Sequence, residues 1–468
     1  MSALLAILIA YAALMVLLGA AAGRRVETTQ GFFVAKRALG PGLLFATLLA
    51  ANIGGGSTVA ATALGYTNGL AGCWWVGSAG IGSLVLAFWI GPRMRREAAE
   101  HGLNTVGDYL EHRYSPGVRT VVAALLWLGT LAILAGQLIS LSVVLTAVTG
   151  TPKWLGCVLG GVVVTIYFTA GGLTSSAWVN VLQLSVKLVG FGLAVPLALG
   201  HGGGWNAVVA RISAPDAYWS VWRNGNAGWM YLVLLGPAFV VSPGLLQKIF
   251  GARDDRTVRL GTGLNALGLL AFAFVPPVLG VIARSLHPGL ADPQLALPTL
   301  FVRDLPFAVG ALGLAAIFSA ELSAADAILF MLATSLSQDL YRRVVNPGAS
   351  DERVLRVARL AAAGGGVLAV LLSIGASTII SALSFFYSVL GVCLFVPVVG
   401  GLYLRRVGRR DALAAVVGGM IVMLAVQLPR GGAPIGWLTP AMAGLAASIV
   451  CAAAAAAFLA RRTPAALG

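Results

Sequence analysis

The sequence predicts an all-α membrane protein whose chain crosses the lipid bilayer many times. Two observations support this fold class. Of the 468 residues, 59% are hydrophobic and only 10% are charged, whereas a soluble domain carries about 25% charged residues. The apolar residues also gather in segments long enough to cross the hydrocarbon core, which is roughly 30 Å thick. A soluble fold of this length could not bury so much apolar surface, so the composition excludes a soluble enzyme or binding domain.

Thirteen apolar segments follow one another along the chain, and each is predicted to form a transmembrane helix. They cover approximately residues 2–22, 41–69, 70–92, 120–148, 154–170, 174–200, 228–248, 260–283, 305–337, 360–378, 380–403, 412–427 and 436–460. The first segment lacks the positively charged start of a signal peptide, so we expect it to be retained as a helix.

The basic residues predict the orientation of the chain in the membrane. If the N-terminus lies outside, 24 of the Lys and Arg residues, including Arg119 and Lys248, fall in cytoplasmic segments and six fall in external segments. This division follows the positive-inside rule. We therefore expect a multi-pass protein of the cell (inner or plasma) membrane with a cytoplasmic C-terminus. The net charge of +15 then sets topology, and nucleic acid is not an expected partner.

Two of the predicted helices contain residues that disfavour a continuous helix. The first has Gly54-Gly55-Gly56 at its middle, followed by Ser57 and Thr58, and three glycines cost roughly 3 kcal/mol of helix propensity relative to alanine. The second has Gly236-Pro237 and Ser242-Pro243-Gly244, and proline removes a backbone donor. We expect the second helix to break at one of these two places.

Each interrupted helix is the first of a block of five predicted helices. Because five is odd, the two blocks lie in opposite orientations, and interrupted helices at matching positions mark the binding site of an inverted-repeat transporter. The predicted divisions are a peripheral first helix and cytoplasmic loop (1–40), the first five-helix repeat (41–200), an external loop (201–227), the second, inverted repeat (228–403), and two peripheral helices with a short cytoplasmic tail (404–468).

Three charged residues fall within the predicted helices, namely Lys187, Glu321 and Asp326. A charge at the bilayer centre costs at least about 2.5–3.5 kcal/mol, so each needs a partner, water or a function. Five residues on one helix separate Glu321 from Asp326 by about 140°, so the two cannot form a carboxylate dyad. Each carboxylate is either hydrogen-bonded inside the bundle or functional, and Lys187 either pairs with one of them or takes part in coupling.

Four sequence motifs, in order along the chain, resemble those of the sodium:solute symporter family. They are Ala50-Ala51-Asn52-Ile53 with Gly65-Tyr66 and Gly69-Leu70, Asn104 to Leu110 with Arg113-Tyr114, Gly171-Gly172-Leu173 with Trp178 to Gln183, and Ser323 to Asp326 with Ser337 to Tyr341. The resemblance covers nearly the whole chain. It implies the LeuT-type architecture of five plus five inverted repeats.

The resemblance also implies a cation site between the first and eighth core helices. Its ligands would be the carbonyls of Ala50, Ile53 and Ala320 and hydroxyls at positions 323 and 324. Ser323 has the hydroxyl and Ala324 does not. Two further departures weaken a sodium site, because Asn180 replaces the aspartate of the family and Lys187 lies two turns along the same predicted helix.

The expected function is the cation-coupled symport of a small organic solute by alternating access. Sodium is the coupling ion that the resemblance implies. The alternative is a proton-coupled or uncoupled carrier in which Lys187 replaces the cation. A membrane sensor fits less well, and no enzyme activity is expected. The residues expected to contact solute or to serve coupling are Asn52, Gly54, Gly55, Gly56, Ser57, Thr58, Asn180, Gln183, Lys187, Pro237, Glu321 and Asp326. The expected lining of the solute pocket also includes Trp74, Trp75, residues 236–243 and residues 384–388.

The expected partners are the solute and the lipid bilayer, and the oligomeric state stays open. No cofactor is expected apart from Na⁺ or H⁺ as coupling ion. No metal site is expected beyond one for a monovalent cation, because His101, His112, His201 and His287 lack the spacing of metal ligands. The four cysteines fall in apolar segments and are expected to be buried apolar residues.

Overall fold

The computed structural model describes residues 3–23, 37–169, 173–376, 378–404, 406–429, 431–435 and 438–462. Several sequence predictions fall outside these residues, namely those for the basic residues Arg24, Arg25, Lys36, Arg405 and Arg430, the motif pair Gly171-Gly172, and the tail 463–468.

The described chain is almost entirely helical. Its elements are α1 (Ala3–Gly23), α3 (Pro41–Asn52), η2 (Gly56–Ala60), α4 (Ala61–Asn68), η3 (Gly69–Cys73), α5 (Trp74–Val85), η4 (Leu86–Ile90), α6 (Gly91–Glu100), α7 (Val106–Arg113), α8 (Pro116–Thr149), α9 (Lys153–Thr169), α10 (Leu173–His201), α11 (Trp205–Arg211), η5 (Asp216–Tyr218), β1 (Arg223–Asn224), β2 (Ala227–Gly228), α12 (Tyr231–Val241), α13 (Pro243–Phe250), α14 (Asp255–Phe272), α15 (Val275–Leu286), η6 (Pro293–Leu295), α16 (Ala296–Arg303), α17 (Phe307–Thr334), η7 (Ser335–Val345), α18 (Asp351–Gly375), α19 (Ile379–Tyr403), α20 (Arg409–Gln427) and α21 (Pro440–Arg462).

The helices confirm a protein that crosses the membrane many times. Within the described residues, ten helical stretches are long and apolar enough to span a bilayer, and three shorter apolar helices accompany them. One of the ten, Gly56–Glu100, covers parts of two predicted helices. The count of thirteen transmembrane helices therefore stays a prediction.

The first predicted interruption is present at the glycine run. Helix α3 ends at Asn52, and the π-helical η2 begins at Gly56. The hydroxyl of Ser57 accepts a hydrogen bond from the Gly54 N–H (2.9 Å) and donates to the Asn52 carbonyl (2.8 Å). Unwound backbone at membrane depth needs such partners. The serine that follows the glycines thus stabilises the break that they permit.

The second interruption is at Ser242, one of the two predicted places. Helix α12 ends at Val241 and α13 begins at Pro243, with Ser242 between them at φ −56° and ψ 120°. Pro243 lacks an N–H and therefore suits the first turn of α13.

Pro237, the other predicted place, is not at the break, and its assignment to the site stays a prediction. It lies inside the continuous helix α12. A Cβ atom added to Gly82 of α5 would lie 2.7 Å from the carbonyl oxygen of Gly236. The Gly236-Pro237 pair therefore belongs to a close contact between α5 and α12.

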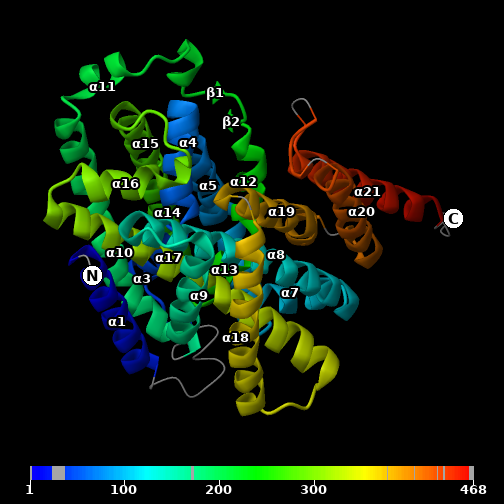
Figure 1. Cartoon of the computed structure of the whole chain (residues 1–468). Coiled ribbons are helices and arrows are strands. Elements are labelled where there is room, and N and C mark those ends of the chain that lie inside the picture. Colours follow the sequence, from blue (N-terminus) through cyan, green and yellow to red (C-terminus); the bar gives the residue numbers. More distant parts are fainter. Residues whose placement is uncertain are drawn as a thin grey trace.

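The interrupted helices lie inside the bundle, and the first and last helices lie at its edges. Helix α3 packs against α10, α14 and α17, and α12 packs against α5 and α19. Helices α20 and α21 pack together beside α19 at one edge, and α1 packs against α9, α10 and α17 at the other (Figure 1). A cavity between the two breaks is therefore enclosed by the central helices.

The predicted external loop 201–227 contains the short helix α11 and the antiparallel pair β1–β2, which lie together at the top of Figure 1. The buried Tyr218 hydroxyl fixes this loop to α4 by donating to the Gly65 carbonyl oxygen at 2.9 Å. Burial raises the pKa of the Tyr218 phenol to about 12. The hydroxyl therefore stays protonated and keeps donating at neutral pH.

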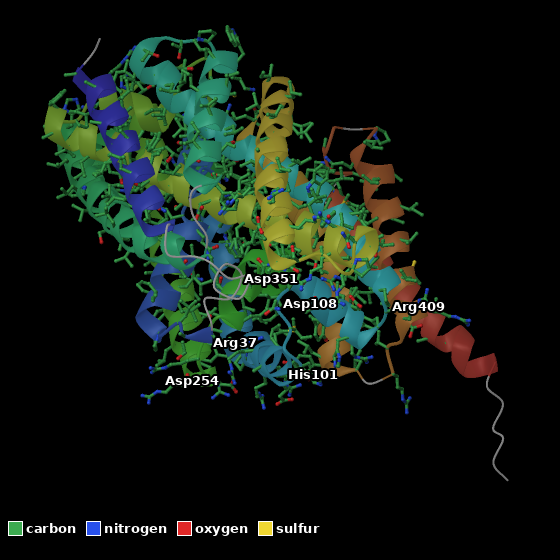
Figure 2. The ribbon with its side chains drawn as sticks, turned by 90° about the horizontal axis from the view of Figure 1, so that it is seen from below. Arg37, His101, Asp108, Asp254, Asp351 and Arg409 are labelled. Carbon is green, nitrogen blue, oxygen red and sulfur yellow. The ribbon has the colours of Figure 1, made fainter. Side chains whose placement is uncertain are left out.

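The opposite side, which the sequence predicts to be cytoplasmic, carries an ion-pair cluster. The guanidinium of Arg119 in α8 contacts Asp108 (2.9 Å), Glu111 (2.6 Å) and Asp339 (2.5 Å). Arg119 is only 2% exposed, although the sequence placed it among loop residues. Figure 2 views the molecule from below, with Asp108 labelled among other charged side chains.

Candidate functional site

A cavity lies between the two helix breaks. Its lining residues come from α3, η2, α5, α8, α12, α13, α14, α17 and α19 and their connections, and they are Ala51, Asn52, Gly54, Gly56, Ser57, Trp75, Val76, Ala79, Ile133, Gln137, Leu235, Phe239, Ser242, Gly244, Leu245, Lys248, Leu269, Ala324, Ala327, Ile328, Met331, Leu383, Phe386 and Tyr387. Of the predicted residues for solute or coupling, Asn52, Gly54, Gly56 and Ser57 line this cavity.

The other predicted residues are not among those that line the cavity. They are Gly55, Thr58, Asn180, Gln183, Lys187, Pro237, Glu321 and Asp326. Two of them contact α3 near the first break: Lys187 bonds the Ala50 carbonyl oxygen, and Asn180 bonds the Thr47 hydroxyl.

The cavity wall combines aromatic rings with a few polar groups. The Trp75 and Tyr387 rings meet edge to face with centroids 6.3 Å apart, and Phe239 lies 5.6 Å from Tyr387. Polar atoms come from Asn52 and Gln137 among others. Apolar walls with a small number of placed polar groups are typical of sites for small organic molecules.

Lys187 of α10 reaches the break in α3 and makes three hydrogen bonds there. Its Nζ donates to the carbonyl oxygens of Ala50 (2.6 Å) and Ile53 (3.0 Å) and to Ser323 Oγ (2.5 Å). The side chain is fully buried. An ammonium group has three donors and no acceptor, so the three oxygens satisfy it completely.

These oxygens are three of those expected to ligate the cation. The Ser323 hydroxyl donates to the Ala50 carbonyl oxygen (2.8 Å) and also lies within donating distance of the Ala320 carbonyl oxygen (3.2 Å). The Ala324 side chain is a methyl group that packs against Gly54, where an added Cβ would lie only 2.5 Å away. The Lys187 ammonium group thus lies among the atoms that the resemblance assigns as ligands of a cation. This is the position expected if Lys187 replaces that cation.

Glu321 lies on the other side of the glycine run. Ser140 Oγ donates to its Oε1 at 2.5 Å, and its Oε2 has no hydrogen-bond partner among the described residues. The ion pairs of the described residues do not include one between Lys187 and Glu321, although the two charges attract each other. The static ion pair that the sequence left open as an alternative for Lys187 is therefore not formed with Glu321.

Lys248 is the residue whose sequence assignment needs correction. The sequence placed it in a cytoplasmic segment, but it is 4% exposed and lines the cavity. Its Nζ donates to the Thr47 carbonyl oxygen at 2.8 Å and interacts electrostatically with Asp326. Asn180 donates to the hydroxyl of the same threonine at 3.2 Å. Asn180, Lys248 and Asp326 therefore lie close to one another, one helical turn from Ala50.

Gln183 and Thr58 lie outside the cavity lining, and their predicted part in solute contact or coupling stays a prediction. Gln183 is fully buried, and neither atom of its amide group has a partner among the described residues. The Thr58 hydroxyl donates to the Gly54 carbonyl oxygen at 2.9 Å and so stabilises the break.

The sequence missed Gln137 as a residue of the cavity wall. Gln137 lines the cavity and accepts a hydrogen bond from the Gly55 N–H at 2.9 Å. A single glutamine in the middle of the apolar segment 120–148 was a usable signal. The aromatic residues of the wall, Trp75, Phe239, Phe386 and Tyr387, all fall in segments that the sequence predicts to line the solute pocket.

The comparison with protein families decides the assignment. The model of the sodium:solute symporter family matches residues 32–419, which is most of the chain. The chain belongs to the sodium:solute symporter family. It is therefore a multi-pass membrane transporter, and the cation-coupled symport of a small solute expected from the sequence agrees with this family.

Individual relatives of the symporter are distant. The high-affinity proline transporter of Bacillus subtilis (strain 168) is 24% identical over 454 residues, covering 93% of this chain and 94% of that protein. The sodium/glucose cotransporter of Vibrio parahaemolyticus is 25% identical and covers 74% and 69%. The high-affinity choline transporter 1 of Caenorhabditis elegans is 22% identical and covers 88% and 71%.

A solved structure confirms the fold of the symporter. The structure of a Na⁺-coupled sialic acid symporter in a substrate-bound, outward-open state matches with a TM-score of 0.80 at 20% identity, covering 98% of both chains. The LeuT-type fold class predicted from the sequence is confirmed. The exact limits of the two five-helix repeats stay a prediction.

Proposed function

We propose that this symporter couples the transport of a small organic solute to protons and that Lys187 takes the position assigned to Na⁺. The observation that supports the proposal is the set of three hydrogen bonds from Lys187 Nζ to Ala50, Ile53 and Ser323. A covalently attached charge in this position leaves no coordination sphere for a mobile ion.

The energetics oppose a sodium ion beside the ammonium group. Two like charges 4 Å apart repel each other by about 4 kcal/mol at an effective dielectric constant of 20. The methyl group of Ala324 offers no ligand in compensation. A sodium ion could enter only if Lys187 lost its proton or left the break in α3.

Proton exchange follows from the same contacts. Two of the three acceptors are carbonyl oxygens of the broken helix, so a shift of the backbone at Ile53 withdraws them from the ammonium group. Hydrogen bonds to a charged form favour that form, and their loss favours proton release. The proton passes from Lys187 Nζ to water on the side that is then open.

The cavity supports a small organic solute. It is lined by Asn52, Gln137 and aromatic rings, and the relatives are named as transporters of proline, glucose and choline. The proposed orientation has the N-terminus outside and the C-terminus in the cytoplasm, as the basic residues predict.

Transport in proteoliposomes tests the proposal. A thermal-shift screen across amino acids, sugars, carboxylates and quaternary amines first supplies a solute. Its uptake is then measured in sodium-free buffer with and without a proton gradient, for the wild type and Lys187→Met. The methionine keeps the length of the buried side chain and removes the charge. We expect uptake that follows the proton gradient in the wild type and loses this dependence in Lys187→Met.

Lys153→Met is the matched control, because among the described residues the side chain of this lysine bonds only the Ala376 carbonyl oxygen, at the end of α18. Its uptake should follow the proton gradient as in the wild type. Strict dependence of wild-type uptake on Na⁺ would overturn the proposal.

A further inference from the structure

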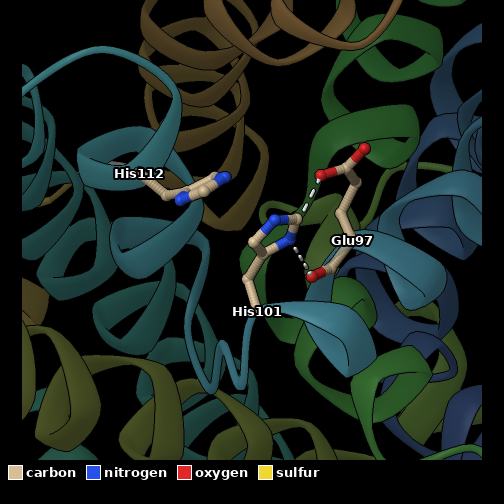
Figure 3. A group of neighbouring side chains, drawn as sticks. All are labelled: Glu97, His101 and His112. Atoms are coloured by element: carbon tan, nitrogen blue, oxygen red, sulfur yellow. Dashed lines mark hydrogen bonds and ion pairs between the residues drawn. The ribbon is translucent and has the colours of Figure 1, made fainter.

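Glu97, His101 and His112 meet on the side of the molecule that the sequence predicts to be cytoplasmic. Each offers one ligand atom, and the three atoms lie within 4.8 Å of one another. The imidazole rings of His101 and His112 face each other with centroids 4.1 Å apart (Figure 3). The spacing of the histidines in the sequence did not predict this group, because the turn between α6 and α7 brings them together.

The chemistry of the group suits a zinc-like ion. Two imidazoles and one carboxylate are a ligand set found around Zn²⁺, with a fourth position for water. Bond lengths of 2.0–2.2 Å place tetrahedral ligand atoms roughly 3.3 Å apart. Side-chain rotations that move each ligand atom by about 1 Å would therefore close the site. Nitrogen ligands favour zinc and its transition-metal neighbours over Mg²⁺ and Ca²⁺.

One histidine already has the partner that a metal ligand needs. His101 Nδ1 lies 3.1 Å from the Glu97 carbonyl oxygen and 3.6 Å from Glu97 Oε2, so the carboxylate would have to turn toward Nε2 to share an ion with it. A metal-binding histidine almost always donates its other ring N–H to such a group, which fixes the tautomer. With Nδ1 donating, Nε2 of His101 is free to bind the ion. His112 has no ring hydrogen bond among those of the described residues.

The ligands come from two different groups of helices. Helix α6, which ends just before His101, packs against α13 and α14. Helix α7, which carries His112, packs against α8, and its Asp108 and Glu111 pair with Arg119. Alternating access moves one group of helices against another. An ion held by both helices would resist such a movement.

We propose that Glu97, His101 and His112 form a binding site for a zinc-like divalent cation that ties α6 to α7 and slows transport when occupied. This inference is independent of the coupling ion. It assigns a regulatory function to a surface turn.

Metal binding is measured first, on the full chain in detergent with any affinity tag removed. Zn²⁺ is titrated against a chromophoric zinc chelator, for the wild type, His101→Ala, His112→Ala and Glu97→Gln. We expect one ion per chain in the wild type. Loss of an outer partner of a ligand costs 10–100-fold in affinity, so loss of a histidine ligand should weaken binding by at least about tenfold.

His201→Ala is the matched control. This exposed histidine lies on the opposite side, 3.9 Å from Asp304, which also contacts His287 at 2.7 Å. Binding should be unchanged in it, and unchanged thermal stability of all variants without zinc would show that they fold. Equal zinc affinity in the wild type and His112→Ala would overturn the site, as would loss of binding in His201→Ala alone.

The second measurement addresses transport. Zn²⁺ should slow solute uptake by the wild type and leave uptake by His112→Ala unaffected at the same concentration. If zinc binds to Glu97, His101 and His112 without changing the uptake rate, the proposal that the ion slows transport by tying α6 to α7 is overturned.

Discussion

At the scale of single residues, the glycine run Gly54-Gly55-Gly56 and Lys187 act at the same break after α3: the glycines permit it, and the lysine bonds its carbonyl oxygens. The glycines let α17 and α8 approach the unwound backbone. A Cβ atom added to Gly55 would lie 2.6 Å from Glu321 Oε2 and 2.7 Å from Ser140 Cβ. The unwound carbonyls that result are the acceptors of Lys187. The position of the ammonium group therefore depends on the absence of side chains at the break.

A leucine in place of Gly55 tests this dependence. We expect Gly55→Leu to abolish uptake, because its side chain must displace Glu321, Ser140 or the backbone of the break. Gly192→Leu is the control, since a Cβ at Gly192 of α10 meets nothing within 4 Å. Uptake is measured in proteoliposomes, with monodispersity in detergent as the check on folding. Normal uptake by Gly55→Leu would remove this glycine from the mechanism.

At the scale of helices, the sequence predicted the two interruptions because glycine and proline act locally on the backbone. The surroundings of Lys187 followed from the family resemblance, which assigns Ala50, Ile53 and Ser323 to the cation that this lysine was expected to replace. Lys248 was missed. It stands at the end of a predicted helix, where a basic side chain is equally compatible with water and with the protein interior. Only the direction of α13 after Ser242 turns it toward the cavity.

Pro237 shows the limit of the same local argument. A proline weakens a helix wherever it occurs, but tertiary packing decides whether the helix breaks. The close contact of α12 with α5 at Gly82 keeps α12 continuous around Gly236-Pro237. The segments that carry the aromatic cavity wall were predicted, but the contacts between distant helices that bring its rings together are not revealed by one sequence.

The cluster around Arg119 joins α7, α8 and η7, and its removal should destabilise the fold. Arg119→Met removes the cation that Asp108, Glu111 and Asp339 share, and leaves the more exposed Arg343 beside Asp108 (3.9 Å) and Glu111 (3.6 Å). Breaking a buried ion pair from one side costs about 3–5 kcal/mol, so we expect a lower free energy of unfolding and a lower Tm in detergent. Arg356→Met is the control, because its pair with Glu352 is exposed (72% and 85%) and exposed pairs contribute little. Equal Tm values for the two variants would contradict the structural importance of the cluster.

At the scale of the whole molecule, the charges, the two breaks and the family agree on a transporter that opens alternately to each side. The side that holds Arg119 and the turn between α6 and α7 is predicted to be cytoplasmic, and the side with α11 and the β1–β2 pair is predicted to be external. Both the direction of proton coupling and the access of zinc to its proposed site depend on this orientation.

Labelling of introduced cysteines decides the orientation. Asp216 lies in the predicted external loop, and Arg256 lies near the predicted cytoplasmic end of α14; both are exposed. In intact cells, a membrane-impermeant maleimide should label Asp216→Cys and not Arg256→Cys, because the basic segments are retained on the cytoplasmic side. Lysed cells should show labelling of both. The unmodified chain is the blank: Cys73, Cys157 and Cys393 are buried, and any label on the partly exposed Cys451 is subtracted. The reverse pattern in intact cells would invert the topology, and zinc added outside would then reach Glu97, His101 and His112 directly.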